Sequence, residues 1–219
     1  MAAEPRLTVL LFLALSACAG LASAPDEPLV DLRGVDPRVV IDMRYATPDN
    51  FTKTTLYPAG RCLLRSAVAK RLSLVQTDLE AQGLGLKAWD CYRPLSIQKK
   101  FWALVPDTRY VADPKKGSRH NRGAAVDVTL VDAGGRDLEM PTRFDDFSQR
   151  AHRDWLGAAP AALRNRQILE SAMARHGFVG LATEWWHFDA KGFARYPVLD
   201  EPLDPPTPTL PHKGGGNDK

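Results

Sequence analysis

The sequence is short of several features that would point to common protein classes. It has only three cysteines, and its net charge at pH 7 is only +3 over 219 residues. A charge this small, with no basic stripe interleaved with aromatic residues, gives no support for nucleic-acid binding. The sequence also lacks the H-E-x-x-H, C-x-x-C, P-loop, dinucleotide-binding and G-x-S-x-G patterns. Their absence removes the common chemistries that these motifs carry.

An apolar run near the N-terminus, Leu7–Ala17, is too short to span a bilayer as a stable helix. Its length is that of the apolar region of a signal peptide. The run ends in L-S-A-C at Cys18, which resembles the bacterial lipoprotein signal, whose cysteine carries the lipid. Cleavage after A-S-A at residues 22–24 is the alternative. We expect residues 1–17 to be a signal peptide and the protein to be exported to the periplasm, anchored to a membrane through Cys18.

The remaining cysteines also indicate export. If Cys18 carries lipid, Cys62 and Cys91 remain as an even pair in an oxidising compartment, so we predict a disulfide between them. It would tie the start of a helix to the end of a strand, and in the chain-entropy model it contributes about 3–4 kcal/mol. The alternative is two unpaired buried thiols that behave as small apolar side chains.

Length and composition predict one soluble globular domain over residues 29–198, with a linker over 18–28 and a disordered tail over 199–219. Apolar residues recur at helical spacing before Gly83 and before Gly177, where glycine is typical of a helix C-terminus. Helices are expected over 63–82, 95–104 and 160–176, and strands over 39–45, 84–92, 123–131, 178–181 and 183–189.

Two distant clusters carry the candidate chemistry. His120 and Asp127 lie seven residues apart, and the segment E-W-W-H ends far downstream at His187. A lone carboxylate such as Asp127 inside an apolar strand is costly to bury, which favours a cation beside it. Two imidazoles and a carboxylate, with one position left for water, are typical of a catalytic zinc site. Glu184 then stands where a general base could act, although each residue alone also fits an ordinary structural role.

The wider pattern resembles a known family. S-x-H-x-x-G-x-A-x-D over 118–127, followed by E-W-W-H over 184–187, is similar to the zinc D-Ala-D-Ala dipeptidases of the vancomycin-resistance type. Further matches occur in the family's order: Y-A and N-F within 45–51, W-D-x-Y-R-P at 89–94 and R-F-D at 143–145. The E-W-W-H segment favours the dipeptidase branch over its carboxypeptidase relatives.

The resemblance implies a fold and a set of roles. The fold is a single small α+β domain, with a central antiparallel sheet flanked by helices and zinc in a central cleft. His120, Asp127 and His187 would hold one zinc ion per chain. Glu184 would take a proton from the attacking water and pass it to the leaving amine, and Arg93 would stabilise the oxyanion.

Three further positions would shape the substrate pocket: Tyr45, Ser118 and Asp145. Asp145 is the candidate partner for the free ammonium of the substrate. The chain departs from the family at Cys91, where the resistance enzymes carry glycine. It departs again at 141–142, where P-T replaces a glycine-containing turn ahead of Asp145.

These observations predict a zinc metallopeptidase that hydrolyses the small D,D-dipeptide D-Ala-D-Ala, with neither nucleic acid nor another protein as partner. Export suggests turnover of wall-derived dipeptide. Two alternatives stay open: a peptidoglycan endopeptidase or carboxypeptidase on the same scaffold, and a non-catalytic, zinc-stabilised module that binds cell wall.

Overall fold

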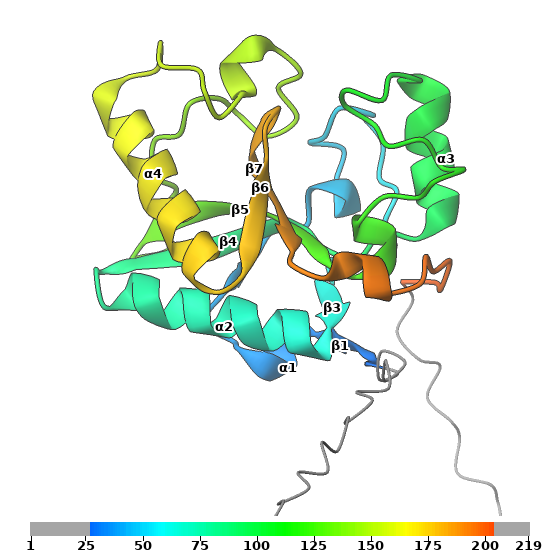
Figure 1. Ribbon diagram of the computed structural model, residues 1–219, viewed down its shortest axis with the longest axis horizontal. Helices are drawn as coiled ribbons and strands as arrows, with labels where there is room; N and C mark the ends of the chain where they lie inside the picture. Colours follow the sequence, from blue (N-terminus) through cyan, green and yellow to red (C-terminus); the bar gives the residue numbers. More distant parts are fainter. Residues whose placement is uncertain (1–26, 204–219) are drawn as a thin grey trace, which may run out of the picture.

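A five-stranded sheet forms the centre of the computed structural model, which describes residues 27–203 (Figure 1). Its strands, in spatial order, are β2 (Val40–Ile41), β4 (Leu84–Asp90), β5 (Ala125–Asp132), β7 (Glu184–Ala190) and β6 (Phe178–Leu181). Every neighbouring pair is antiparallel except β2 and β4, which run parallel. The predicted α+β class is therefore confirmed, with a sheet that is antiparallel apart from one short edge strand.

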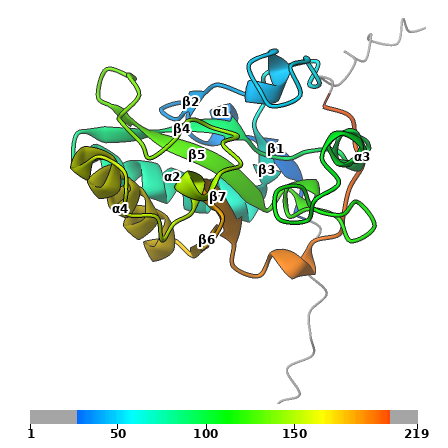
Figure 2. The same cartoon turned by 90° about the horizontal axis from the view of Figure 1, so that it is seen from above.

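Two helices cover one face of the sheet. Helix α2 (Ser66–Glu80) and helix α4 (Pro160–Arg175) pack against each other and against the strands, as both Figure 1 and Figure 2 show. Each buries an apolar stripe at helical spacing, and the short helix α1 (Leu32–Val35) packs beside α2. Burial of such stripes supplies most of the stability of amphipathic helices in proteins.

A second apolar cluster surrounds helix α3 (Leu95–Leu104), which stands apart from the α2–α4 pair (green in Figures 1 and 2). The buried members of this cluster are Tyr45, Tyr57, Leu63, Tyr92, Ile97, Phe101, Val111 and Leu203. Strands β1 (Leu29–Asp31) and β3 (Leu63–Arg65) form a separate two-stranded antiparallel sheet, which lies lower than α3 in Figure 1. Four short 3-10 helices complete the described elements: η1 (Arg44–Ala46), η2 (His120–Arg122), η3 (Gln149–Ala151) and η4 (Phe193–Arg195).

Two expected elements begin or end at other residues. The strand expected over 39–45 is limited to Val40–Ile41, because the chain then turns into η1 and places Tyr45 in the second cluster. The helix expected from residue 63 begins at Ser66, because Leu63–Arg65 pairs with β1 instead. Pairing with a strand more than thirty residues away in the sequence overrides the local helical pattern here.

The packed part of the chain extends beyond the expected boundary at residue 198. The backbone N–H of Leu199 donates to the carbonyl of Asn121 at 2.8 Å, and the hydroxyl of Tyr92 donates to the carbonyl of Glu201. Leu203 is buried in the second apolar cluster. The expectation of a disordered tail over 199–219 is therefore wrong for residues 199–203, and the rest of that range lies outside the described residues.

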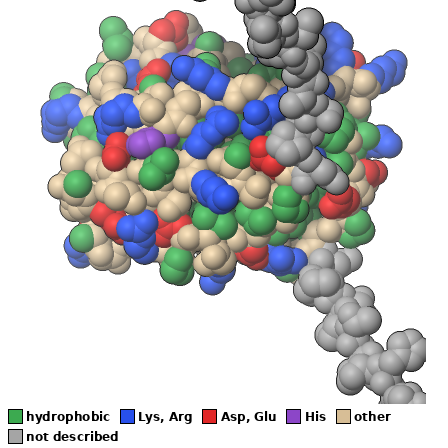
Figure 3. Space-filling view, turned by 60° about the horizontal axis from the view of Figure 1, so that its bottom comes forward, with side chains coloured by type: hydrophobic (Ala, Val, Ile, Leu, Met, Phe, Trp, Pro, Cys, Tyr) green, Lys and Arg blue, Asp and Glu red, His purple; other side chains and the backbone are tan. Residues whose placement is uncertain are grey.

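Cys62 and Cys91 form a disulfide in the structure, which joins the chain just before β3 to the residue after β4. The predicted signal peptide, Cys18 and residues 204–219 lie outside the described residues. Over residues 27–203, no helix is long and apolar enough to cross a membrane. On the face seen in Figure 3, basic and acidic side chains are interspersed and hydrophobic side chains lie singly or in small groups.

Candidate functional site

The candidate site begins as a row of residues across three neighbouring strands. Asp90 at the end of β4 is paired with Asp127 of β5, which in turn is paired with His187 of β7. Directly opposed residues in antiparallel strands hold their side chains close together on the same face of the sheet. The strand pairing itself therefore brings together residues 37 and 60 positions apart in the sequence.

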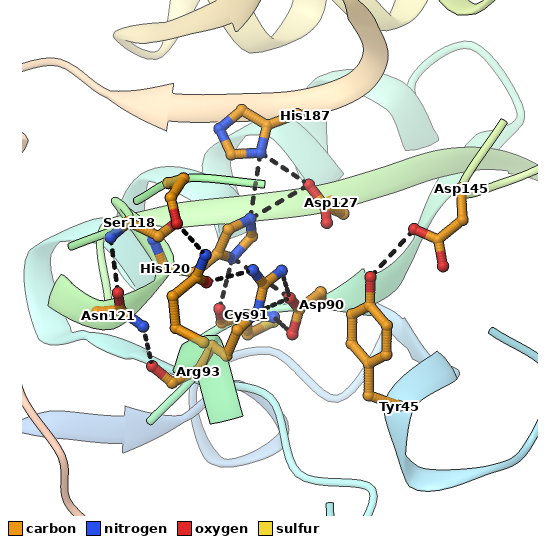
Figure 4. Close-up of polar contacts among 12 residues, drawn as sticks. Tyr45, Asp90, Cys91, Arg93, Ser118, His120, Asn121, Asp127, Asp145 and His187 are labelled. Atoms are coloured by element: carbon orange, nitrogen blue, oxygen red, sulfur yellow. Dashed lines mark hydrogen bonds and ion pairs between the residues drawn. The ribbon is translucent and has the colours of Figure 1, made fainter. Parts of the chain in front are cut away.

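His120 reaches this row from the tight turn η2, just before β5. The turn ends at Gly123, whose φ of +65° favours glycine, and a Cβ there would lie 2.4 Å from Cδ2 of Leu29. The hydroxyl oxygen of Ser118 accepts a hydrogen bond from the backbone N–H of His120 at 3.2 Å. The side-chain amide of Asn121 donates to the carbonyl of Arg93 at 2.7 Å and ties this turn to the end of β4 (Figure 4).

The three predicted ligand side chains converge. Nδ1 of His187 lies 3.0 Å from Oδ1 of Asp127 and 3.1 Å from Nε2 of His120, and that Nε2 lies 3.4 Å from the same carboxylate oxygen (Figure 4). All three residues are buried, and their ligand atoms lie within 4.8 Å of one another. One divalent ion can therefore be reached by all three with modest movement of the side chains.

Each imidazole is held through the ring nitrogen that faces away from the trio. Nδ1 of His120 lies 2.7 Å from the carbonyl oxygen of Cys91, and Nε2 of His187 lies 2.9 Å from Oδ1 of Asp189. An acceptor at one nitrogen places the proton of a neutral imidazole there and leaves a lone pair on the other nitrogen. In the neutral form that ligates a metal, both rings would therefore present their lone pairs toward Asp127.

The electrostatics of the trio favour positive charge. Burial acts to raise the pKa of Asp127, but His120 and His187 outweigh it and hold that pKa below its usual range. Burial acts to lower the pKa of His187, but hydrogen bonds to Asp127 and Asp189 outweigh it and raise that pKa to about 10. Carboxylates thus stabilise a cation at this place, which is the environment that a metal ion needs.

Glu184, the first residue of β7, stands beside the trio. Its Oε2 lies 4.0 Å from Nδ1 of His187, and only 12 % of its side chain is exposed. Burial, with the negative charges of Asp127 and Asp145, raises the pKa of Glu184 to about 8 despite the opposing effect of His187. A carboxylate with a pKa near the working pH is suited to accept and return a proton.

Arg93 follows β4 and is held by three hydrogen bonds. Its Nε and Nη2 donate to Oδ2 of Asp90 at 3.2 and 2.5 Å (Figure 4). Its Nη1 donates to the side chain of Gln98 at 2.8 Å. Asp90 is fully buried and also accepts from the hydroxyl of Tyr57 at 2.7 Å. A guanidinium has five N–H donors, so two remain beyond these contacts among the described residues.

Asp145 lies on the opposite side of the trio from Ser118 in Figure 4. Its carboxylate accepts from the hydroxyl of Tyr45 at 3.0 Å and from the backbone N–H of Phe51 at 3.1 Å. Burial raises the pKa of Asp145 to about 7, although these two hydrogen bonds act to lower it. Its φ of +58° is unusual for a residue with a side chain, so the surrounding contacts hold this backbone in place.

One small cavity of about 110 Å³ connects these groups. All eight predicted catalytic, metal and substrate residues line it: Tyr45, Arg93, Ser118, His120, Asp127, Asp145, Glu184 and His187. Aromatic rings from both apolar clusters, including Phe101 and Trp186, complete the wall. The volume is well below the roughly 300–1,000 Å³ usual for drug-sized ligands, so the cavity suits a small molecule.

Several contributors were not predicted from the sequence. Asp189 and the carbonyl of Cys91 orient the two imidazoles, and Asp90 with Gln98 holds Arg93. Asp189 follows His187 by two residues on a strand, and period-two alternation could have identified it. Nothing in the local sequence marks Gln98, because its contact depends on how α3 packs.

Comparisons with known proteins agree with these motifs. The family model described as "D-ala-D-ala dipeptidase" (Peptidase_M15) matches residues 26–203. A D-alanyl-D-alanine dipeptidase of Escherichia coli (strain K12) is 42% identical over 175 residues, which cover 78% of this chain and 89% of that protein. One of Enterococcus faecalis is 33% identical over 182 residues, covering 74% and 86%. The solved vancomycin-resistance D,D-dipeptidase VanXYg, in complex with a D-Ala-D-Ala phosphinate analogue, is 23% identical with a TM-score of 0.38, covering 59% and 51%.

Proposed function

The chain belongs to the D-Ala-D-Ala dipeptidase family, and from that membership we propose that it hydrolyses the amide bond of D-Ala-D-Ala with the help of one bound zinc ion. The observation that carries this proposal is the convergence of His120, Asp127 and His187 in the same small cavity as Glu184 and Arg93. A purely structural metal site would need neither a buried general base nor a buried guanidinium beside it. The arrangement therefore favours catalysis over the alternative of a non-catalytic wall-binding module.

The residues fit zinc on the chemistry of the donor set. Two imidazole nitrogens and one carboxylate are ligands that zinc accepts, and three protein ligands leave a position for water. The second nitrogen of each imidazole has an acceptor that fixes its orientation. Zinc bound there would act as a Lewis acid that lowers the pKa of a water to about 7.

The protein's own groups account for proton movement. Glu184, whose Oε2 lies 4.0 Å from Nδ1 of His187, would accept a proton from the attacking water. The same carboxyl group then returns that proton to the amine that leaves when the amide bond breaks. Its pKa of about 8 allows both transfers near neutral pH.

Two groups of the proposed substrate, its free ammonium and the carbonyl of the amide bond that breaks, are recognised by opposite charges. The carboxylate of Asp145, at the wall formed with Tyr45 and Phe51, would pair with the free ammonium of the dipeptide. The unused N–H groups of Arg93 would donate to the carbonyl oxygen as negative charge develops on it during attack. Because Asp90 and Gln98 fix the guanidinium beforehand, little reorganisation accompanies the reaction.

Hydrolysis assays with and without a chelator test this function. Purified protein should release alanine from D-Ala-D-Ala, lose activity in a strong chelator and recover it with added zinc. L-Ala-L-Ala and a pentapeptide that ends in D-Ala-D-Ala serve as comparison substrates. Faster cleavage of the pentapeptide would favour the carboxypeptidase alternative, and hydrolysis that persists in chelator would exclude a role for zinc.

We also propose that the protein acts outside the cytoplasm as a lipoprotein, with Cys18 as the acylated residue. The disulfide between Cys62 and Cys91 supports an oxidising compartment. Fractionation of cells that express the wild type or Cys18→Ser tests the anchor, since the variant should leave the membrane fraction. Equal membrane association of both forms would reject lipidation at Cys18.

A further inference from the structure

We propose that Asp189 is a positioning residue for the metal site, which fixes the ring of His187, and that Arg119 supports it by ion pairing. The inference rests on the proposed zinc-dependent function, because it concerns the same site. Nε2 of His187 lies 2.9 Å from Oδ1 of Asp189, while Nδ1 faces Asp127 and His120. The ring is thus held between a carboxylate at each nitrogen.

The strand geometry explains why this contact forms. Side chains two residues apart on a strand lie on the same face, so Asp189 and His187 project from β7 together. Asp189 is also paired with Ala125 at the start of β5, two residues before Asp127. Only 13 % of its side chain is exposed, so water competes little for its oxygens.

The two histidines are oriented by different kinds of group. The ring of His120 is held by a backbone carbonyl, that of Cys91, which no side-chain substitution removes. The ring of His187 is held by a side chain, that of Asp189. Without this acceptor the ring can rotate or adopt the other tautomer, which would place its proton toward Asp127. Asp189 is therefore the position at which ligand orientation can be altered without changing a ligand.

Arg119 adds a link between the two ligand-bearing segments. It immediately precedes His120, and its Nε lies 3.4 Å from Oδ2 of Asp189, the oxygen that does not face His187. The ion pair thus joins Arg119, the residue before His120, to Asp189, two residues after His187. The side chain of Arg119 is 43 % exposed, so we assign it a smaller effect than Asp189.

The test measures zinc affinity by competition with a chelating indicator. Asp189→Ala should weaken zinc binding about 10–100-fold, the usual effect of removing such a partner. Asp189→Asn, whose amide oxygen still accepts a hydrogen bond, should weaken it less. Arg119→Ala should cost no more than about five-fold. The control Asp154→Asn, which makes the same chemical change at an exposed site, should match the wild type.

A double variant separates a supporting role of Arg119 from an independent one. If Arg119 acts through Asp189, adding Arg119→Ala to Asp189→Ala should weaken zinc binding no further. Cobalt-substituted protein gives a second readout, since a reoriented His187 should change the visible absorption bands of Asp189→Ala. Thermal unfolding of the metal-free proteins checks that each variant folds. If Asp189→Ala does not fold, the zinc affinity and cobalt spectrum of Asp189→Asn decide the test.

The outcomes are distinguishable. A wild-type protein that binds no zinc would overturn the proposed function itself. A wild type that binds zinc, with Asp189→Ala and Asp189→Asn equal to it in affinity and cobalt spectrum, would overturn only the positioning role of Asp189. A further loss in the double variant would overturn the dependence of Arg119 on Asp189.

Discussion

The carbonyl oxygen of Cys91 lies 2.7 Å from Nδ1 of His120, and the same residue closes the disulfide with Cys62. One residue therefore both orients a candidate zinc ligand and crosslinks the end of β4 to the chain before β3. Arg93 lies only two positions further on. The crosslink thus restrains the segment that holds both the hydrogen-bond acceptor of a proposed zinc ligand and the proposed oxyanion donor.

Loss of the disulfide should lower stability. The bridge spans 29 residues, for which the chain-entropy model gives about 3–4 kcal/mol. Cys62→Ala with Cys91→Ala should lower the free energy of unfolding in urea by this amount, and the reduced wild type should behave similarly. If the oxidised and reduced wild types unfold at the same urea concentration, the crosslink contributes nothing measurable to stability.

Replacement of the proposed general base should separate binding from chemistry. Glu184→Gln keeps the shape of the side chain but cannot accept the proton of the attacking water. We expect kcat for D-Ala-D-Ala to fall about 10²–10⁴-fold while zinc stoichiometry stays at that of the wild type. Steady-state kinetics and metal analysis of the same samples measure kcat and zinc content together. Normal turnover in this variant would assign the base to another group.

Arg93 should affect both turnover and stability. Arg93→Ala should lower kcat about 10²–10³-fold through loss of the oxyanion donor. It should also destabilise the fold by about 3–5 kcal/mol, because Asp90 would remain buried without its cationic partner. Arg93→Lys retains the charge and should recover part of the stability but little of kcat. Urea unfolding and steady-state kinetics on both variants distinguish the two effects.

Together with the proposed general base Glu184, Asp145 should contribute to the acid side of the pH profile. Its pKa of about 7 means that the carboxylate needed to bind an ammonium is lost as pH falls through 7. Because Glu184, whose pKa is about 8, must also lose its proton before it can act as the base, kcat/KM for D-Ala-D-Ala should fall below neutral pH through two ionisations. Asp145→Asn should lose one of the two, so its acid limb should be less steep, and it should have a higher KM. The pH dependence of kcat/KM for both proteins is the measurement, and an unchanged acid limb in the variant would reject the assignment.

The carboxyl group of Asp145 should have the opposite pH dependence in its effect on folding stability. Because burial raises the pKa of Asp145 in the native state, the unfolded chain gives up this proton at lower pH than the folded chain does. Its contribution to stability is therefore full below about pH 4 and declines as pH rises toward 7. Asp145→Asn should lack this decline in urea unfolding measured across that range. A parallel pH dependence in both proteins would show that Asp145 ionises equally in the two states.

The sequence predicted some parts of this molecule better than others. Helix α3 begins after a proline and matches its expected range, and α4 ends one residue before the expected limit, because capping and turn residues act locally. The local pattern wrongly predicts a helix over residues 63–65, since their partner strand β1 lies far away in the sequence. The ligand candidates could be named from their chemistry and family resemblance. The acceptors behind them could not, because Asp189 and the Cys91 carbonyl act only once ring orientations are known.

The row formed by Asp90, Asp127 and His187 has a consequence for how the sheet can vary. A one-residue slip between β5 and β7 would turn every side chain of one strand to the opposite face. Such a slip would bury the wrong set of residues and at the same time carry His187 away from Asp127. An insertion or deletion within either strand would therefore both expose apolar side chains and separate the two proposed ligands.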